Sequence, residues 1–278
     1  MNVTPDLLAH TVELVRAIAR STIMPRFRKL AADQVQMKSG PSDLVTIADE
    51  EAEVQLTHAL TRLVPGCAVV GEEAATRDPA SMAVLSTADL CFIVDPIDGT
   101  FNFAAGLPLF GVMVAVVEHG RTVAGIIHDP VGDDTAMALA GQGAWLRAAD
   151  GNRSRLQVAQ AAPISAMNGS LSWRYMAEPR RSRVCSRMPR LGGVWDYRCA
   201  AHQYRMLAAG HAHFSVYNRL LPWDHAAGVL LHQEAGGYAA RLDGTPYTPL
   251  SEQGGLICAP DRASWSALRQ TLFEDEAA

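Results

Sequence analysis

The sequence lacks an excess of positive charge, and it lacks long apolar runs. Its 278 residues carry 24 Lys and Arg against 29 Asp and Glu, a net charge of −5. Such a chain has no global positive field to hold nucleic acid or an anionic membrane. No apolar run approaches the roughly 18 residues of a membrane-spanning helix, and residues 1–6 lack the basic start of a secretion signal. We therefore expect no binding to nucleic acid or membranes, and any anionic substrate must be attracted locally.

A disulfide framework is also missing. The five cysteines are odd in number, widely spaced and mostly placed in apolar runs. This usage is typical of a reducing compartment, so we expect a cytoplasmic protein. Hydrophobic residues make up 49% of the chain, and 22 Gly and 15 Pro are no excess. The composition predicts a globular protein with a sizeable core and excludes disordered and fibrous classes.

Hydrophobic periodicity predicts helices around a central sheet. Thr4, Pro5 and Asp6 form a helix-start signal, and the apolar spacing after them predicts a helix to about Pro25. The His119-Gly120 pair predicts a hairpin turn. Helices are further predicted at 49–63, 195–209, 222–236 and from 260, and strands at 68–70, 91–94, 111–118, 121–128, 134–140, 156–158, 213–217 and 238–242. Six arginines fall within residues 174–190, and we favour an exposed surface helix there over a polyanion-binding site.

Two carboxylates follow the apolar run Cys91–Val94. Pro96 cannot donate a ladder hydrogen bond, which predicts that the strand ends beside Asp95 and Asp98. The carboxyl edge of a sheet is where open α/β folds place their ligands. A sharp turn at Pro96 is expected to direct the Ile97 carbonyl and both carboxylates into one pocket.

The residues after this turn suit an anion. Asp98 is expected to cap a short helix whose first amides belong to Gly99 and Thr100. Free amides at a helix N-terminus bind phosphate, and Gly99 allows close approach to the backbone. The same stretch therefore offers hard oxygen ligands for a cation and a cradle for a neighbouring anion.

Two further acidic elements complete the set. Glu72 and Glu73 end the apolar run before them, and Asp224 lies in the first turn of a predicted helix. Glu72, Asp95, Asp98 and Asp224 could not all stay ionised at close range without a counter-charge. Oxygen ligands without a His or Cys cluster indicate Mg²⁺, with Mn²⁺ as a substitute, rather than Zn²⁺.

The acidic motifs together resemble the signature motifs of the inositol monophosphatase family. Gly71-Glu72-Glu73, the run Asp95–Thr100 and Trp223-Asp224 stand in that family's order and spacing. Lys38, with Asp43–Thr46 and Asp49, resembles its N-terminal segment, so the likeness spans about residues 38–260. It implies a layered αβαβα sandwich similar to fructose-1,6-bisphosphatase, Mg²⁺-dependent and lithium-sensitive hydrolysis of a small phosphorylated metabolite, and a homodimer.

The resemblance also assigns roles. It implies two or three Mg²⁺ ions held by Glu72, Asp95, the Ile97 carbonyl, Asp98 and Asp224. Asp49 and Thr100 would orient the attacking water, and Glu73 would lie just outside the metal shell. Gly99 and Thr100 would bind the phosphate, with Lys38 near the phosphate or a third metal. No Cys, Ser or His nucleophile accompanies the acids, so we expect direct attack by metal-activated water.

We expect one phosphatase domain over residues 1–278. Its N-terminal α+β half, 1–150, would carry the metal motifs. Its C-terminal α/β half, 151–278, would carry the substrate-side residues and the last metal aspartate.

The substrate side departs from the inositol-specific pattern. Relatives that act on inositol phosphates place a glutamate seven residues before the last metal aspartate, where this chain has Tyr217. They carry Gly-Ser or Gly-Thr before an Ala-Ala pair, where this chain has Arg198 and Cys199. The carboxylate that would accept hydrogen bonds from vicinal hydroxyls is missing, and the cationic side chain of Arg198 has been added. These changes disfavour recognition of inositol but do not affect the prediction of hydrolysis.

Several substrates therefore stay open. Besides an inositol phosphate, relatives hydrolyse fructose-1,6-bisphosphate, a 3'-phosphoadenosine nucleotide or histidinol phosphate, and Arg198 is a candidate contact for a second anionic group. An alternative of another class is a partner-binding regulatory protein with a residual metal site, which would use the arginine-bearing segment 174–190. The complete acid set argues against that alternative.

Overall fold

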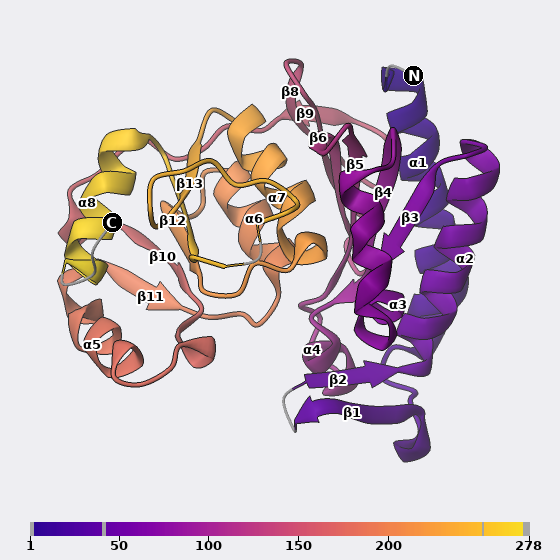
Figure 1. Ribbon diagram of the computed structural model, residues 1–278, viewed down its shortest axis with the longest axis horizontal. Helices are drawn as coiled ribbons and strands as arrows, with labels where there is room; N and C mark the ends of the chain where they lie inside the picture. The colour runs from indigo at the N-terminus through magenta and orange to yellow at the C-terminus, as the bar shows by residue number, and fades with distance from the viewer. Residues whose placement is uncertain (1–2, 41–42, 252, 275–278) are drawn as a thin grey trace.

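Helices and sheets alternate in five layers (Figure 1). The computed structural model describes residues 3–40, 43–251 and 253–274. Helices α1 and α2 cover the outer face of a seven-stranded sheet, α6 and α7 lie between this sheet and a five-stranded one, and α8, with α5 beside it, covers the far face. The predicted αβαβα sandwich is confirmed. The helices are α1 (Pro5–Ile18), α2 (Ile47–Leu63), α5 (Arg180–Arg187), α6 (Ala200–Ala208), α7 (Pro222–Glu234) and α8 (Arg262–Phe273).

The larger sheet has the strand order β3-β4-β5-β6-β7-β8-β9. Only the β3–β4 pair is parallel, and the other neighbours are antiparallel. His119 and Gly120 have φ angles of 48° and 75° between β5 and β6, as in a type I′ hairpin turn. The strands are β3 (Ala68–Gly71), β4 (Leu90–Asp98), β5 (Gly111–Glu118), β6 (Arg121–Asp129), β7 (Asp134–Leu139), β8 (Gly143–Arg147) and β9 (Arg153–Arg155).

The smaller sheet has the order β11-β10-β12-β14-β13. Strand β10 is parallel to both of its neighbours, while β14 runs antiparallel to β12 and β13. A separate two-stranded ribbon, β1 with β2, lies beside the short helix α4. These elements are β1 (Val35–Gly40), β2 (Asp43–Thr46), β10 (Asn168–Leu171), β11 (Gly193–Trp195), β12 (Phe214–Tyr217), β13 (Tyr238–Arg241), β14 (Leu256–Ala259), α3 (Glu72–Arg77) and α4 (Thr100–Ala104).

Helix α7 is buried on nearly all sides because it lies between the two sheets. Two glycines let it approach its neighbours closely. A Cβ on Gly125 of β6 would lie 2.6 Å from the Ala227 carbonyl oxygen, and a Cβ on Gly228 would lie 2.1 Å from the Tyr204 ring. This packing fixes the first turn of α7, which carries Asp224.

The N-terminal helix starts as predicted. The Thr4 side chain accepts a hydrogen bond from the Leu7 amide at 3.2 Å, with Pro5 at the first helical position. The α-helix ends at Ile18, and a π-helical and a 3₁₀ turn continue the path to Arg26. Within the described residues no helix is long and apolar enough to cross a lipid bilayer.

Three predicted elements differ from the structure. Residues 156–158 form no strand, because the Leu156 and Val158 amides donate outside the ladder, to the Ala144 and Ala235 carbonyls. The helix predicted from Trp195 begins only at Ala200, after a tight turn. The arginine-bearing segment forms a helix only over 180–187, so Arg174 precedes it in a separate 3₁₀ turn.

Candidate metal centre

Three aspartates converge although they come from two parts of the chain. Asp95 and Asp98 lie at the end of β4, and Asp224 lies in the first turn of α7. One carboxylate oxygen from each lies within 4.8 Å of the other two. This spacing allows divalent cations to be shared between them. The prediction that these acids share one pocket is confirmed in the geometry of the described residues.

The strand that carries the first two aspartates does not end at Pro96. Its pairing with β5 continues to Asp98, which is opposite Gly111, and the register shifts between Asp95 and Asp98. Pro96 has no N–H for the ladder, so the chain bulges there instead of leaving the sheet. The Ile97 amide donates to Asp95 Oδ1 at 3.0 Å and steadies the bulge.

Asp98 does not cap the helix that follows it. Gly99, with φ of +90°, is itself the N-cap of α4. The Asp98 carboxylate instead accepts a hydrogen bond from the Ala201 amide at 2.5 Å and lies 3.1 Å from the Cys199 sulfur. The first amides of a helix have no partner within the helix and bind carboxylates well. The Asp98 carboxylate therefore accepts from the start of α6 and not from the start of α4.

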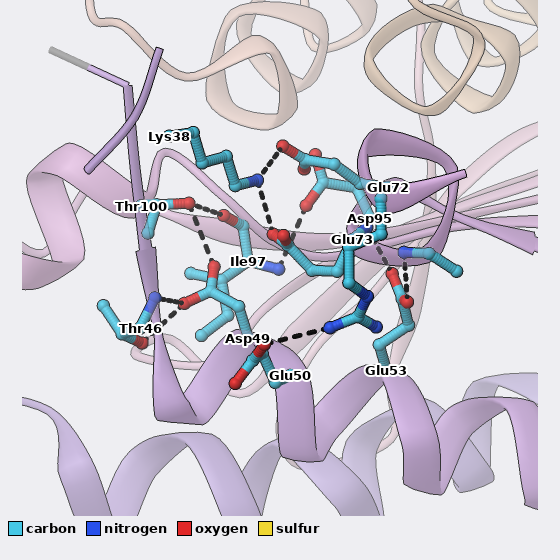
Figure 2. A network of polar contacts seen from close by, with 12 residues as sticks. Lys38, Thr46, Asp49, Glu50, Glu53, Glu72, Glu73, Asp95, Ile97 and Thr100 are labelled. Atoms are coloured by element: carbon cyan, nitrogen blue, oxygen red, sulfur yellow. Dashed lines mark hydrogen bonds and ion pairs between the residues drawn. The ribbon is translucent and has the colours of Figure 1, made fainter. Parts of the chain in front are cut away.

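The glutamates of α3 reach the same centre (Figure 2). Glu72 lines a cavity of about 120 Å³ together with Asp95, Asp98 and Asp224. Lys38 of β1 donates to Glu72 Oε1 at 2.9 Å and to Glu73 Oε1 at 2.7 Å. Lys38 therefore lies beside the predicted metal site, where it neutralises part of the acidic cluster.

A chain of polar contacts leads from α2 to this cavity (Figure 2). The Thr100 hydroxyl lies 3.0 Å from Asp49 Oδ1 and 3.0 Å from the Ile97 carbonyl oxygen. The other Asp49 oxygen accepts hydrogen bonds from the Thr46 amide, at 2.9 Å, and the Thr46 hydroxyl. Gly99 and Thr100 line the cavity. The predicted water-orienting and phosphate-binding residues are thus adjacent to the acids.

Burial makes this cluster unstable as a set of free charges. It raises the pKa of Asp95 and Asp224 well above the usual value for an aspartate, and neighbouring carboxylates raise both further. Burial also raises the pKa of Asp98 to about 6, of Asp49 to about 7 and of Glu73 to about 8. A cation would relieve the repulsion, and carboxylate and carbonyl oxygens are the donors that Mg²⁺ and Mn²⁺ prefer. The residues present therefore fit such a metal.

One positioning residue was missed. The buried Glu53 carboxylate of α2 accepts hydrogen bonds from the Glu73 amide at 2.7 Å and the Ala74 amide at 2.9 Å. It thereby holds the start of α3, which carries Glu72. No sequence signal marks this role, because a glutamate within a helix is usually exposed and its partners lie 20 and 21 residues away.

A second cavity, of about 100 Å³, adjoins the first. Asp98, Asp224, Tyr175, Arg198 and Arg219 line both cavities. The predicted substrate-side residues Arg198 and Tyr217 lie in the second cavity. Two more of its arginines are Arg174 and Arg219. Arg174 belongs to the segment 174–190, for which we favoured an exposed surface helix over a polyanion-binding site, and Arg219 was not predicted as a site residue.

Comparisons with known proteins agree with this geometry. The model of the inositol monophosphatase family matches residues 5–275. The chain is 30% identical over 244 residues to an inositol-1-monophosphatase of Bacillus subtilis, covering 87% of this chain and 86% of the relative. It is also 30% identical over 260 residues to a fructose-1,6-bisphosphatase/inositol-1-monophosphatase of Thermotoga maritima, covering 91% and 93%.

The fold comparison leads to the same family. A solved structure of an IMPase from Thermotoga maritima superposes with a TM-score of 0.82 at 27% identity, covering 97% of both chains. This chain belongs to the inositol monophosphatase family.

Proposed function

We propose that this family member is a Mg²⁺-dependent hydrolase of phosphate monoesters with a small polar phosphorylated metabolite as its substrate. The observation that carries the proposal is the convergence of Asp95, Asp98 and Asp224 oxygens within 4.8 Å. Glu72 lines the same cavity, next to Gly99 and Thr100 at the start of α4. A site for cations therefore lies beside a site for an anion.

The ions would be held by Glu72, Asp95, the Ile97 carbonyl, Asp98 and Asp224. When bound, they would supply neutralisation of the phosphate oxygens, activation of water and stabilisation of the leaving oxygen. The backbone at Gly99 and Thr100 would orient the phosphate with amides that the first turn of α4 leaves free.

Asp49 and Thr100 would orient the attacking water and accept its proton. The Thr100 hydroxyl can donate to Asp49 or to the Ile97 carbonyl, and its oxygen can accept from a water in the cavity. Because burial raises the pKa of Asp49 to about 7, its carboxylate can take up a proton near neutral pH. Glu73, which accepts a hydrogen bond from Lys38, would lie just outside the shell of metal ligands.

A covalent intermediate on cysteine is not part of the proposal. Cys199 is the cysteine beside the acids, and burial and the Asp98 charge raise its thiol pKa well above the usual value. A thiol held protonated is a poor nucleophile. Direct attack by water is the route that the residues support.

The remaining properties rest on the family. We infer inhibition by lithium, a homodimer and a cytoplasmic location from membership alone. We likewise infer that residues 1–278 fold as one domain, to which the halves 1–150 and 151–278 both contribute metal ligands.

The test is phosphate release from a panel of sugar, inositol, nucleotide and amino-alcohol phosphates, with and without Mg²⁺ and Li⁺. We expect Mg²⁺-dependent release that Asp95→Asn lowers by at least roughly 100-fold, beyond the 10–100-fold typical of losing a group that only supports a metal ligand. Asp89→Asn is the matched control, because Asp89 precedes the same strand with an exposed side chain. Absence of release from every substrate, or full activity of Asp95→Asn, would contradict the proposal and favour the partner-binding role.

A further inference from the structure

Helix α6 contains none of the candidate metal ligands, yet it contacts two of the elements that carry them. Its Ala201 amide donates to the Asp98 carboxylate at the end of β4. Further along the same helix, the Tyr204 ring lies against α7, where Gly228 leaves room for it. The two helices lie side by side between the sheets (Figure 1). One helix therefore contacts both the Asp98 side and the Asp224 side of the candidate metal centre.

A pair of hydrogen bonds connects Tyr204 to the segment before α7. His225 follows Asp224 in the first turn of α7, and its Nδ1 lies 3.0 Å from the Tyr204 hydroxyl oxygen. The other ring nitrogen of His225, Nε2, lies 2.8 Å from the Arg219 carbonyl oxygen. These contacts lead from α6 through the His225 ring to the backbone at Arg219.

The partners of His225 decide which of its nitrogens carries the proton. A carbonyl oxygen only accepts hydrogen bonds, so Nε2 must donate to Arg219. Burial lowers the pKa of His225 to about 4, so the ring is neutral at pH 7 and holds a single proton. Nδ1 is therefore an acceptor, and the Tyr204 hydroxyl donates to it. Tyr204 thereby selects the tautomer that can bind the Arg219 carbonyl.

The His225 ring is enclosed by aromatic side chains. It is 2% exposed, and Tyr204 is fully buried. The Tyr217 ring lies 4.6 Å from the His225 ring at an interplanar angle of 61°, and Tyr217 also stacks on Tyr204 at 5.2 Å. The Tyr247 ring lies 6.1 Å from His225 at 77°. Close packing of this kind keeps the imidazole in the orientation that both hydrogen bonds need.

The Arg219 carbonyl lies in a short connection. Residues 218–221 join β12 to α7, and the Asp224 amide donates to the Leu221 carbonyl at 3.2 Å. The hydrogen bond from His225 ties the middle of this connection back to the first turn of α7. Its loss would free the connection, and with it the backbone from which Asp224 reaches the metal cavity.

We propose that Tyr204 and His225 form a positioning pair, which ties the Arg219 carbonyl to α6 and so fixes the position of Asp224 relative to Asp98 for binding divalent cations. The inference rests on the proposed function, because it assumes that these acids bind Mg²⁺. Both residues act through the backbone before and within the first turn of α7, and neither is itself a candidate ligand.

The affinity of the metal-free full chain for Mg²⁺, measured by calorimetric titration, tests the pair. We expect His225→Leu, which removes both hydrogen bonds, to weaken binding about 10–100-fold, as for other groups that orient a metal ligand. Tyr204→Phe removes only the donor to Nδ1 and should weaken binding by a smaller factor, about 10-fold. His225→Gln keeps an N–H for the Arg219 carbonyl and should recover most of the affinity that His225→Leu loses.

His232→Leu is the matched control. His232 is fully buried in the same helix, and its Nε2 also lies 2.9 Å from a backbone carbonyl oxygen, that of Ala259. It follows Asp224 by about two helical turns, and its partner lies in β14. We expect His232→Leu to lower the free energy of unfolding in urea and to leave the Mg²⁺ affinity as in the wild type.

Two further measurements test whether the residues act as a pair. If Tyr204 acts only through His225, Tyr204→Phe should weaken Mg²⁺ binding no further in the background of His225→Leu. Nitrogen-15 NMR of the wild type should show a protonated Nε2 and an unprotonated Nδ1 for His225. The signals of this ring are identified by their absence from His225→Leu.

Several results would overturn the positioning pair. They are unchanged Mg²⁺ affinity in His225→Leu, an equal loss in His232→Leu, no recovery in His225→Gln, additive losses in the double variant, or a proton on Nδ1 of His225. If His225→Leu does not fold, Tyr204→Phe decides, and wild-type affinity in that variant overturns the pair.

These results are distinguishable from failure of the phosphatase proposal. Mg²⁺-dependent phosphate release by the wild type, with Mg²⁺ affinities that none of the variants changes, would overturn the positioning pair alone. Weakened Mg²⁺ binding in the variants, with no phosphate release by the wild type from any substrate of the panel, would overturn the phosphatase proposal alone.

Discussion

At the scale of single residues, Glu53 supports the candidate metal centre although it does not line the cavity. Its carboxylate satisfies two amides at the start of α3 and so decides where Glu72 lies. Gly71 makes room for it, since a Cβ there would lie 2.3 Å from the Glu53 carboxyl group. The metal centre therefore depends on a glutamate from a helix on the outer face of the sheet.

We expect Glu53→Ala to weaken Mg²⁺ binding about 10–100-fold, because α3 loses the group that orients it. The affinity can be measured by calorimetric titration with Mg²⁺. Glu51→Ala is the control, since Glu51 lies on the same helix but pairs with Arg26 and not with α3. Equal affinities of Glu53→Ala and the wild type would show that α3 holds its place without Glu53.

The candidate metal ligands could be predicted from the sequence because each stands at a strand or helix end within a motif. Glu53 and Arg219 could not, since their positions at the site depend on contacts between distant segments. The capping role expected of Asp98 was wrong for the same reason. The competing partner, the Ala201 amide, is 103 residues away.

At the scale of elements, the packing of α7 against β6 determines the position of Asp224. Gly125 permits this contact, and a methyl group there would press on the Ala227 carbonyl at 2.6 Å. Ala227 and its neighbours in α7 belong to the hydrophobic core between helix and sheet, which is closely packed.

We expect Gly125→Ala to lower the free energy of unfolding by about 1–3 kcal/mol, the usual cost of overpacking, and to lower kcat/KM because Asp224 moves with α7. Urea denaturation and a phosphatase assay measure the two effects. Gly193→Ala is the matched control, since a Cβ at this strand glycine would make only an ordinary contact at 3.6 Å with Asn168. An unchanged unfolding free energy in Gly125→Ala would mean that α7 can shift without loss.

Local signals explain which elements were predictable. Helix α1 has a cap, a first-turn proline and an acidic residue, so its start followed from Thr4 to Asp6. The start of α6 depended on the left-handed turn at Arg198, which an arginine gives no reason to expect. The continuation of β4 past Pro96 depended on its pairing with β5, a long-range contact.

At the scale of the whole molecule, the buried acids couple stability to pH and metal. Burial raises the pKa of Asp49 to about 7 and of Glu73 to about 8, while in the unfolded chain both groups ionise near pH 4. The folded state therefore holds more protons, and its stability falls as pH rises through these values. The buried histidines, such as His128 with a pKa lowered to about 4, oppose this loss by less than about 0.5 kcal/mol each above pH 6.5, because in the unfolded chain they still hold about half of their protons at that pH.

We expect the metal-free protein to lose unfolding free energy between pH 6.5 and 8.5, with about 2–3 kcal/mol of the loss contributed by Asp49 and Glu73. In saturating Mg²⁺ this loss should shrink or vanish, because cations take the place of the protons. Urea denaturation at several pH values, in chelator and in Mg²⁺, provides the measurement. Identical pH profiles in the two series would contradict the account of the acidic cluster.

The turn Asp196–Arg198 lies immediately before the helix whose Ala201 amide secures Asp98. That anchor is a main-chain group, so it does not depend on which side chains the turn presents. Under the proposed function, exchanging side chains of this turn would change which phosphorylated compound is accepted and leave the candidate metal-binding acids in place. The turn is therefore a short segment to randomise in a search for altered substrate preference.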